Sequence, residues 1–94
     1  MAKLYQISIM FAGPPTEIDI AALEQGFSVL GDWLRFSVFS WYLSSSLSPR
    51  EMTEKLSTTL SPEDQFVILE ANATGADGMA VKGIWDWLKP HAKS

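Results

Sequence analysis

The chain opens with an alternation of apolar and polar side chains. Residues 3–11 repeat with a period of two, which predicts a β-strand rather than a helix, and Gly13-Pro14-Pro15 ends that strand. One face of the strand carries Tyr5, Ile7, Ile9 and Phe11. The other face is mixed and carries Leu4, Gln6, Ser8 and Met10. We therefore expect the first face to meet helices and the second to face solvent or a partner.

A helix is predicted directly after this strand. Thr16 and Asp19 have the spacing of a capping box at a helix start. The apolar residues that follow recur at helical spacing and form one stripe: Ile20, Leu23, Phe27 and Leu30. Gly26 lies within the helix and indicates a close approach to the sheet. Gly31 has the position of a left-handed residue just past the helix end.

Aromatic and β-branched residues dominate the next segment, residues 32–46, and favour strand. The segment is longer than a usual strand of about five or six residues, so we expect a hairpin that turns near Ser37-Val38. One face of its second strand is predicted to carry Phe39, Trp41 and Leu43.

The second helix, predicted over residues 47–60, has the clearest start signal in the sequence. Ser48 is its N-cap, Pro49 takes the first helical position and Glu51 completes a capping box. Its apolar face is predicted to carry Met52, Leu56 and Leu60. After a turn at residues 61–64, the apolar run of residues 66–69 predicts a central or helix-covered strand ending near Ala71.

The last apolar residues of the chain recur at helical spacing and predict a closing helix. Pro90 is expected to end that helix, which would leave His91 in a solvent-exposed tail. Trp85 and Trp87 lie two positions apart and point about 200° from each other around a helix. We expect one of them to face the sheet and the other to face solvent or a partner chain.

These elements predict one α+β domain over residues 1–94, a ferredoxin-like βαββαβ sandwich with an added C-terminal helix. The first and third strands are expected to be central in an antiparallel sheet, with two helices on one face. The C-terminal helix or a second chain is expected to cover the other face. The side chains predicted to be buried are Ile9, Phe27, Leu30, Leu56 and Ile68.

Composition excludes several kinds of site. The net charge of −4 disfavours binding to nucleic acid, because the phosphate backbone repels an acidic protein. The absence of cysteine excludes disulfides and thiolate metal sites, and the single histidine, His91, excludes a site that needs two from one chain. No secretory signal or membrane-spanning stretch is evident, so we expect a cytoplasmic protein with no membrane partner.

Five short segments together resemble the CRISPR-associated protein 2 superfamily, and most closely its stand-alone SinR-like branch. They occur in the family's order along nearly the whole chain: Tyr5-Gln6-Ile7-Ser8-Ile9, Ser40-Trp41-Tyr42-Leu43, Leu47-Ser48-Pro49-Arg50-Glu51, Asp64-Gln65-Phe66-Val67-Ile68-Leu69-Glu70 and Trp85-Asp86-Trp87-Leu88-Lys89. The resemblance implies a ferredoxin-like fold and a homodimer formed through the sheets. It also implies that, in the nuclease members, an acid near the end of the first strand binds a divalent metal across the dimer axis.

This sequence departs from the family at that acid. The matching stretch reads Ile7-Ser8-Ile9-Met10, and a thioether cannot replace a carboxylate as a ligand for Mg²⁺ or Mn²⁺. We therefore expect a dimeric interaction protein with no nuclease activity and no cofactor. The competing hypothesis is an endonuclease for RNA or DNA that uses Mg²⁺ or Mn²⁺ and has moved its acid to Glu70 or Asp32.

The remaining candidate residues have simpler structural interpretations. Ser44-Ser45-Ser46 has no base placed to activate a serine, and Gly75-Ala76-Asp77-Gly78 lacks the spacing of a phosphate-binding loop. The aromatic residues are expected to pack in the core, because a stacking surface for bases also needs a basic groove and Arg35 is the only cation within their segment.

Overall fold

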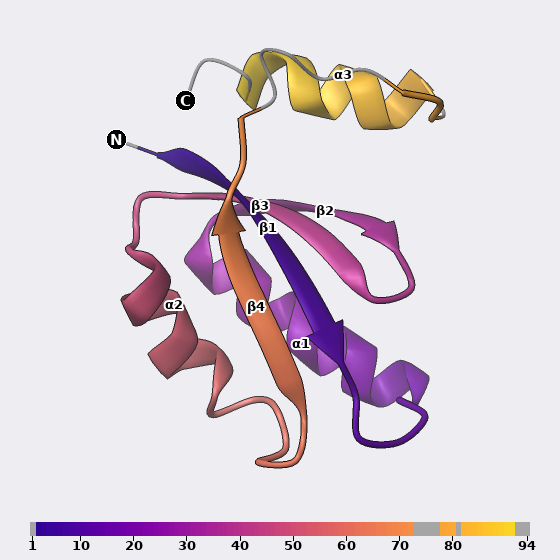
Figure 1. The fold of residues 1–94 in the computed structure, drawn as a ribbon, viewed down its shortest axis with the longest axis vertical. Coiled ribbons are helices and arrows are strands. Elements are labelled where there is room, and N and C mark those ends of the chain that lie inside the picture. The colour runs from indigo at the N-terminus through magenta and orange to yellow at the C-terminus, as the bar shows by residue number, and fades with distance from the viewer. Residues whose placement is uncertain (1, 73–77, 81, 92–94) are drawn as a thin grey trace.

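The computed structural model describes residues 2–72, 78–80 and 82–91, which form an α+β fold. In this part of the chain four antiparallel strands and three helices follow one another in the order shown in Figure 1. The elements are β1 (Lys3–Met10), α1 (Glu17–Leu30), β2 (Asp32–Ser37), β3 (Ser40–Ser45), α2 (Pro49–Leu56), β4 (Gln65–Glu70) and α3 (Lys82–His91). The predicted loop residues 73–77 lie outside the described residues.

The sheet has the strand order β2-β3-β1-β4, and every neighbouring pair is antiparallel. The prediction that β1 and β3 are central is confirmed. The β2–β3 turn falls at Val38 and Phe39, one residue later than expected. β4 is an edge strand whose inner face meets the helix layer, while Val67 and Leu69 on its other face are 57% and 59% exposed. An apolar run does not distinguish a buried strand from an edge strand, because both need hydrophobic contacts on at least one face.

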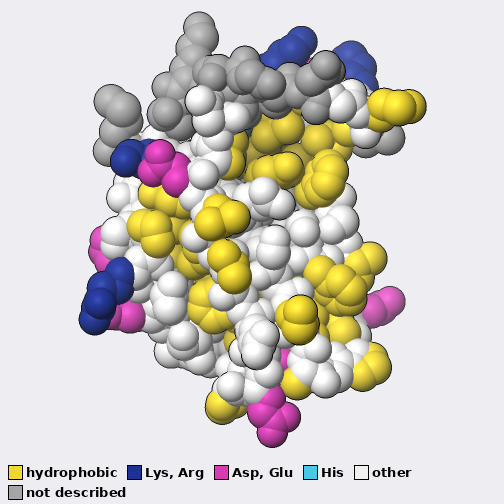
Figure 2. All heavy atoms as spheres, in the orientation of Figure 1, with side chains coloured by type: hydrophobic (Ala, Val, Ile, Leu, Met, Phe, Trp, Pro, Cys, Tyr) yellow, Lys and Arg dark blue, Asp and Glu magenta, His cyan; other side chains and the backbone are white. Residues whose placement is uncertain are grey.

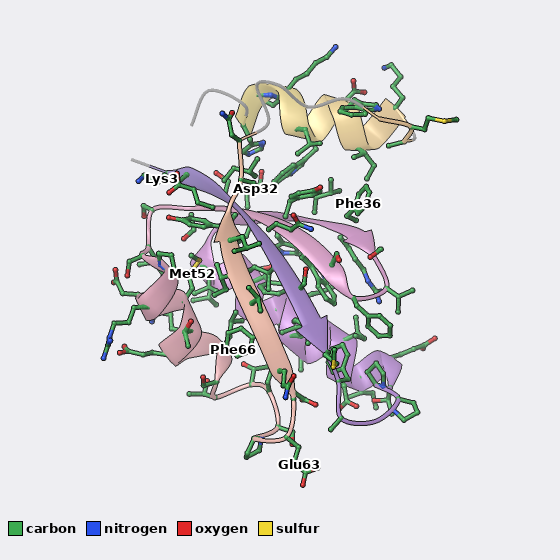
Figure 3. The ribbon with its side chains drawn as sticks, in the orientation of Figure 1. Lys3, Asp32, Phe36, Met52, Glu63 and Phe66 are labelled. Atoms are coloured by element: carbon green, nitrogen blue, oxygen red, sulfur yellow. The ribbon has the colours of Figure 1, made fainter. Side chains whose placement is uncertain are left out.

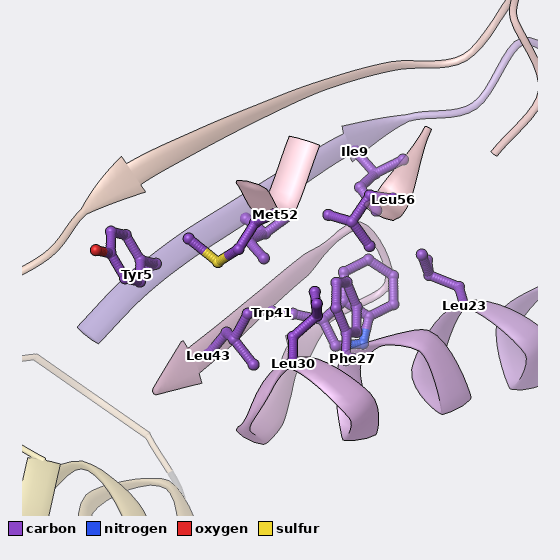
Figure 4. Packing of buried hydrophobic residues seen from close by; sticks show 10 residues of the cluster. Tyr5, Ile9, Leu23, Phe27, Leu30, Trp41, Leu43, Met52 and Leu56 are labelled. Carbon is purple, nitrogen blue, oxygen red and sulfur yellow. The ribbon is translucent and has the colours of Figure 1, made fainter. Parts of the chain in front are cut away.

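The core lies between one face of the sheet and the helices α1 and α2. Phe27 of α1 packs against Trp41 of β3, with ring centroids 5.5 Å apart (Figure 4). Fully buried around this pair are Ile7, Leu23, Leu43, Met52 and Leu56. Of the five side chains predicted to be buried, Ile68 alone is only partly buried, since it lies on an edge strand.

Both predicted capping boxes are present. Thr16 and Asp19 exchange backbone and side-chain hydrogen bonds at the start of α1, and Ser48 and Glu51 do the same at the start of α2. Hydrogen bonds from Thr16, first from its backbone N–H, lower the pKa of Asp19. The equivalent bonds from Ser48 lower the pKa of Glu51. Each carboxylate is therefore stabilised in its charged form at a helix N-terminus.

Three helix predictions need correction. α2 ends at Leu56 rather than at residue 60. Directly after Leu56, the hydroxyls of Ser57 and Thr58 donate to backbone carbonyls of the last turn and so compete with further helical bonding. Gly31 has extended backbone rather than a left-handed one. Glycine is required at position 31 because a Cβ there would lie 1.9 Å from the carbonyl oxygen of Ser44. Gly26 faces Thr59 and not the sheet.

The third helix lies on the opposite side of the sheet from α1 and α2 (Figure 1). It contacts β2 and leaves a small hollow, of about 130 Å³, between Phe36 and Tyr42 of the sheet and Trp85 of α3. Trp85 and Trp87 are both half-buried, so the expectation that one of them faces outward is wrong. Leu88 is the buried residue of α3. The helix thus covers the β2 side of the open face and leaves the β4 side uncovered by described residues.

Candidate functional site

Met10, the residue that the resemblance leads us to expect at the position of a metal acid, is the last residue of β1. Its side chain lies on the open face of the sheet, is 69% exposed and is opposite Gln65 of β4 in the strand register. It borders a hollow of about 680 Å³ whose other walls include Phe11 and Phe39. The rings of these two residues pack with centroids 6.0 Å apart.

The chemistry of this hollow suits an apolar group. Among the described residues, the complete lining is Ile9, Met10, Phe11, Gly13, Pro14, Pro15 and Phe39. These side chains carry no charge and no oxygen donor, whereas Mg²⁺ and Mn²⁺ take hard oxygen ligands. The side chains that line this hollow therefore offer no ligand to a divalent cation.

The structure does not bring the two alternative acids together. Glu70 shares a sheet face with Tyr5 of β1, whereas Asp32 shares the opposite face with Ser44 of β3. The two acids also lie on opposite edge strands. Within the described ranges, no group of three or more metal-ligating side chains of the histidine, cysteine, aspartate or glutamate type is present.

Each of these acids already faces a basic side chain. Glu70 lies 3.5 Å from the Lys3 ammonium, and both side chains are more than half exposed. Asp32 lies 3.2 Å from Nε2 of His91, at the end of the sheet that meets α3 (Figure 3). These contacts account for both carboxylates as parts of the surface structure.

The position of His91 is a correction to the sequence analysis. Pro90 is inside α3, and His91 is the last residue of the helix, with a side chain only 17% exposed. Its ring stacks on Trp87 with centroids 4.0 Å apart. Nδ1 lies 2.6 Å from the carbonyl oxygen of Trp87, and Nε2 faces Asp32. Both ring nitrogens of His91 therefore already face acceptor groups of the protein itself.

The aromatic segment does not form a basic stacking surface. Arg35 donates hydrogen bonds to the carbonyl oxygens of Ser37 and Val38, and its guanidinium lies 5.2 Å from the ring centroid of Trp41. Its charge is therefore used to close the β2–β3 hairpin. The indole of Trp41 donates in turn to Glu24 of α1, which gives that carboxylate a structural role.

The serine run is also structural where it is buried. Ser45 donates from its hydroxyl to the carbonyl oxygen of Leu30 and accepts from the backbone N–H of Leu47. Ser44 is buried on the open face, beside Asp32 in the strand register. Gly75-Ala76-Asp77-Gly78 lies mostly outside the described residues.

Sequence reasoning missed the role of Asp64. One carboxylate oxygen accepts from the backbone N–H of Ala12, and the other accepts from the N–H of Ser61. The Ser-Pro-Glu-Asp pattern predicts the local bond to Ser61, but not the bond to the β1–α1 loop. Asp64 thus fixes the rim of a second hollow, of about 470 Å³, between that loop, α1 and the loop that follows α2.

Comparison of this chain with protein-family models, curated proteins and solved structures finds no match. Among the helices of the described ranges, none has the length and apolar character needed to cross a bilayer.

Proposed function

We propose that this chain is a ferredoxin-like, homodimeric interaction protein of the CRISPR-associated protein 2 superfamily, related to its SinR-like branch, and that it works without nuclease activity and without a cofactor. The element order and the strand order β2-β3-β1-β4 support a ferredoxin-like sandwich. The addition of α3 agrees with the predicted extra C-terminal helix. We further propose a cytoplasmic location and no membrane partner.

The environment of Met10 carries the proposal. A nuclease of this family would need a carboxylate at the end of the first strand, and here a thioether lies beside an uncharged hollow. Each of the two alternative acids already contacts a basic side chain, Glu70 with Lys3 and Asp32 with His91. These observations favour an interaction protein over an endonuclease with a relocated acid.

The test is a nuclease assay of the full chain with single- and double-stranded RNA and DNA, with Mg²⁺ or Mn²⁺ added. We expect no cleavage above the level of a boiled sample. Cleavage that EDTA abolishes would overturn the proposal and favour the endonuclease hypothesis. In that case Glu70→Gln and Asp32→Asn, made separately, would identify the acid by the loss of activity.

The dimer is tested by light scattering over about 1–200 µM chain, a range suited to the weak affinities of small interfaces. The expected mass at the upper end is twice that of one chain. A single-chain mass throughout the range would contradict the dimer without bearing on the nuclease assay.

A further inference from the structure

The free edge of the sheet at β4 offers a row of backbone hydrogen-bonding groups. The N–H of Ala71 donates to the carbonyl oxygen of Leu4 over 2.8 Å, which sets the phase of the β1–β4 ladder. Because bonding residues alternate in antiparallel strands, Phe66, Ile68 and Glu70 direct their N–H and C=O groups away from β1. No strand in the described part of the chain lies on that side.

The side chains on the open face of this edge are exposed. Val67 and Leu69 lie on the open face and are 57% and 59% exposed. On the face shown in Figure 2, charged side chains lie mainly around the rim. Hydrophobic side chains are exposed in the middle of this face, over β4 and β1. Residues 66–69 contain no lysine, no proline and no bulge, which are the features that protect the edges of monomeric sheets.

We propose that β4 pairs in antiparallel fashion with β4 of a second copy of this chain, about a two-fold axis that passes beside Ile68, so that one sheet runs through both copies. The inference rests on the proposed homodimer and names its interface. A second copy is the occupant that fits because the outward N–H and C=O groups of Phe66, Ile68 and Glu70 are self-complementary about a two-fold axis at Ile68. With a net charge of −4, two copies approach most easily through an uncharged surface. Residues 66–69 provide that surface.

Charge and apolar pairing favour a register with the axis at Ile68 over one with the axis at Val67. An axis at Ile68 pairs every outward N–H and C=O of β4 and places Val67 opposite the partner's Leu69, apolar against apolar. An axis at Val67 would place Glu70 opposite the partner's Asp64, and like charges directly opposite are destabilising. In the register at Ile68, Glu70 faces the partner's Phe66 and keeps its contact with Lys3.

This arrangement differs from the one that the family resemblance implies, because it keeps the two Met10 residues apart. β1 of one copy would lie three strand spacings of about 4.8 Å from β1 of the other, with the strand ends at opposite sides of the sheet. No metal site could then be shared between the two copies at Met10. The interface therefore agrees with a protein that has lost its metal acid.

A charge-swap experiment on the full chain tests both the surface and the register. Val67→Lys with Leu69→Lys places like charges opposite one another, and we expect the dimer to weaken by about 100-fold. Val67→Lys with Leu69→Glu places each lysine opposite a glutamate of the other copy, and we expect affinity within about tenfold of the wild type. The matched control is Ile18→Lys with Val29→Lys on α1, where both side chains are about 80% exposed, and no change is expected.

Two measurements do not depend on those variants. Hydrogen exchange of the wild type should slow at the amides of Phe66, Ile68 and Glu70 as the chain concentration rises. Calorimetry of Met10→Asp should show no more Mn²⁺ binding than Met79→Asp, a control at a fully exposed methionine.

The possible results separate the two proposals. A wild type that stays monomeric overturns both the dimer and this interface. A dimer that tolerates Val67→Lys with Leu69→Lys, or whose three edge amides do not slow, overturns the β4 interface alone. Failure of the lysine–glutamate swap to restore affinity overturns the register at Ile68. Mn²⁺ bound between the copies of Met10→Asp would favour stacked sheet faces and overturn edge pairing.

Discussion

β2 and β4 form the two edges of one sheet, but the part of the chain that the structure describes protects only β2. β2 has a register shift between Arg35 and Ser37, and Arg35 donates to the carbonyl oxygens of the turn that follows. Its first residue, Asp32, contacts His91 of α3. β4 keeps a regular register with β1 over its whole length, and an exposed ion pair joins Lys3 to Glu70 at its end.

The difference shows how local chemistry decides what an edge can do. A register shift, an inward-turned charge and a helix on the open face each hinder the addition of a strand, and β2 has all three. The exposed apolar face and regular backbone of β4 favour strand addition instead. The position of α3 over β2 therefore also affects how the sheet can associate, because it leaves β4 as the edge that can add a strand.

Gly31→Ala should have the largest effect on the protected edge. The new Cβ would lie 1.9 Å from the carbonyl oxygen of Ser44, so β2 must move away from β3. We expect a loss of about 1–3 kcal/mol in the free energy of unfolding, measured with urea. Gly13→Ala is the control, since nothing lies within 4 Å of its Cβ position. Equal stability of the two variants would mean that the start of β2 is not tightly constrained.

His91→Ala tests whether α3 holds β2. The substitution removes the stack on Trp87 and the contact with Asp32, and we expect a loss of about 1 kcal/mol together with a change in tryptophan fluorescence. Lys82→Ala is the control, because the ion pair of Lys82 with Asp86 is largely exposed on the same helix and should contribute less than about 0.5 kcal/mol. Equal effects would contradict a specific role for His91 in docking α3.

Arg35→Met tests the closure of the hairpin at the far end of β2. The variant keeps much of the side-chain volume but loses two hydrogen bonds and the contact with Trp41, so we expect a loss of about 0.5–1 kcal/mol. Hydrogen exchange should accelerate at the β2–β3 turn and not in β4. Arg50→Met, at a side chain that is 90% exposed, should leave both the free energy of unfolding and the hydrogen exchange of the turn unchanged.

Short-range patterns predicted most of the fold. The period of β1, the stripe of α1 and the two capping boxes are all local, and each is present where the sequence places it. The apolar run that contains Phe66 and Ile68 does not by itself show that β4 is an edge strand, because such a run also occurs in central strands. The edge position followed only from the expected fold, in which β1 and β3 are central. Strand neighbours depend on tertiary pairing, which no run of residues encodes by itself.

Only part of the candidate site was predicted, because local patterns do not encode tertiary contacts. The position of Met10 at the end of β1 follows from strand alternation and is confirmed. The contact of His91 with Asp32 joins residues far apart in the sequence, and Pro90 gave a misleading stop signal. The stack on Trp87 and the hydrogen bond to its carbonyl oxygen hold the last turn of α3 beyond the proline.

The smallest change in stability is expected from substitutions in the helices beneath the two edges, α1 on the β2 side and α2 on the β4 side. Both begin with a capping box whose acid has a lowered pKa, Asp19 from its ordinary 3.8 and Glu51 from 4.5. Groups of this kind stabilise the fold above their ordinary pKa and lose that contribution as the pH falls through the lowered value.

Asp19→Asn and Glu51→Gln should therefore each flatten the decline of stability below about pH 4.5, while the amide oxygen can still accept the N-cap hydrogen bond. The two effects should be small and similar, because both carboxylates are exposed and make the same bonds. Urea unfolding at about pH 3 and pH 7 measures the change. A flattening in Glu51→Gln alone would show that acid stability differs between the two sides, and the contrast between the edges would then extend into the helix layer.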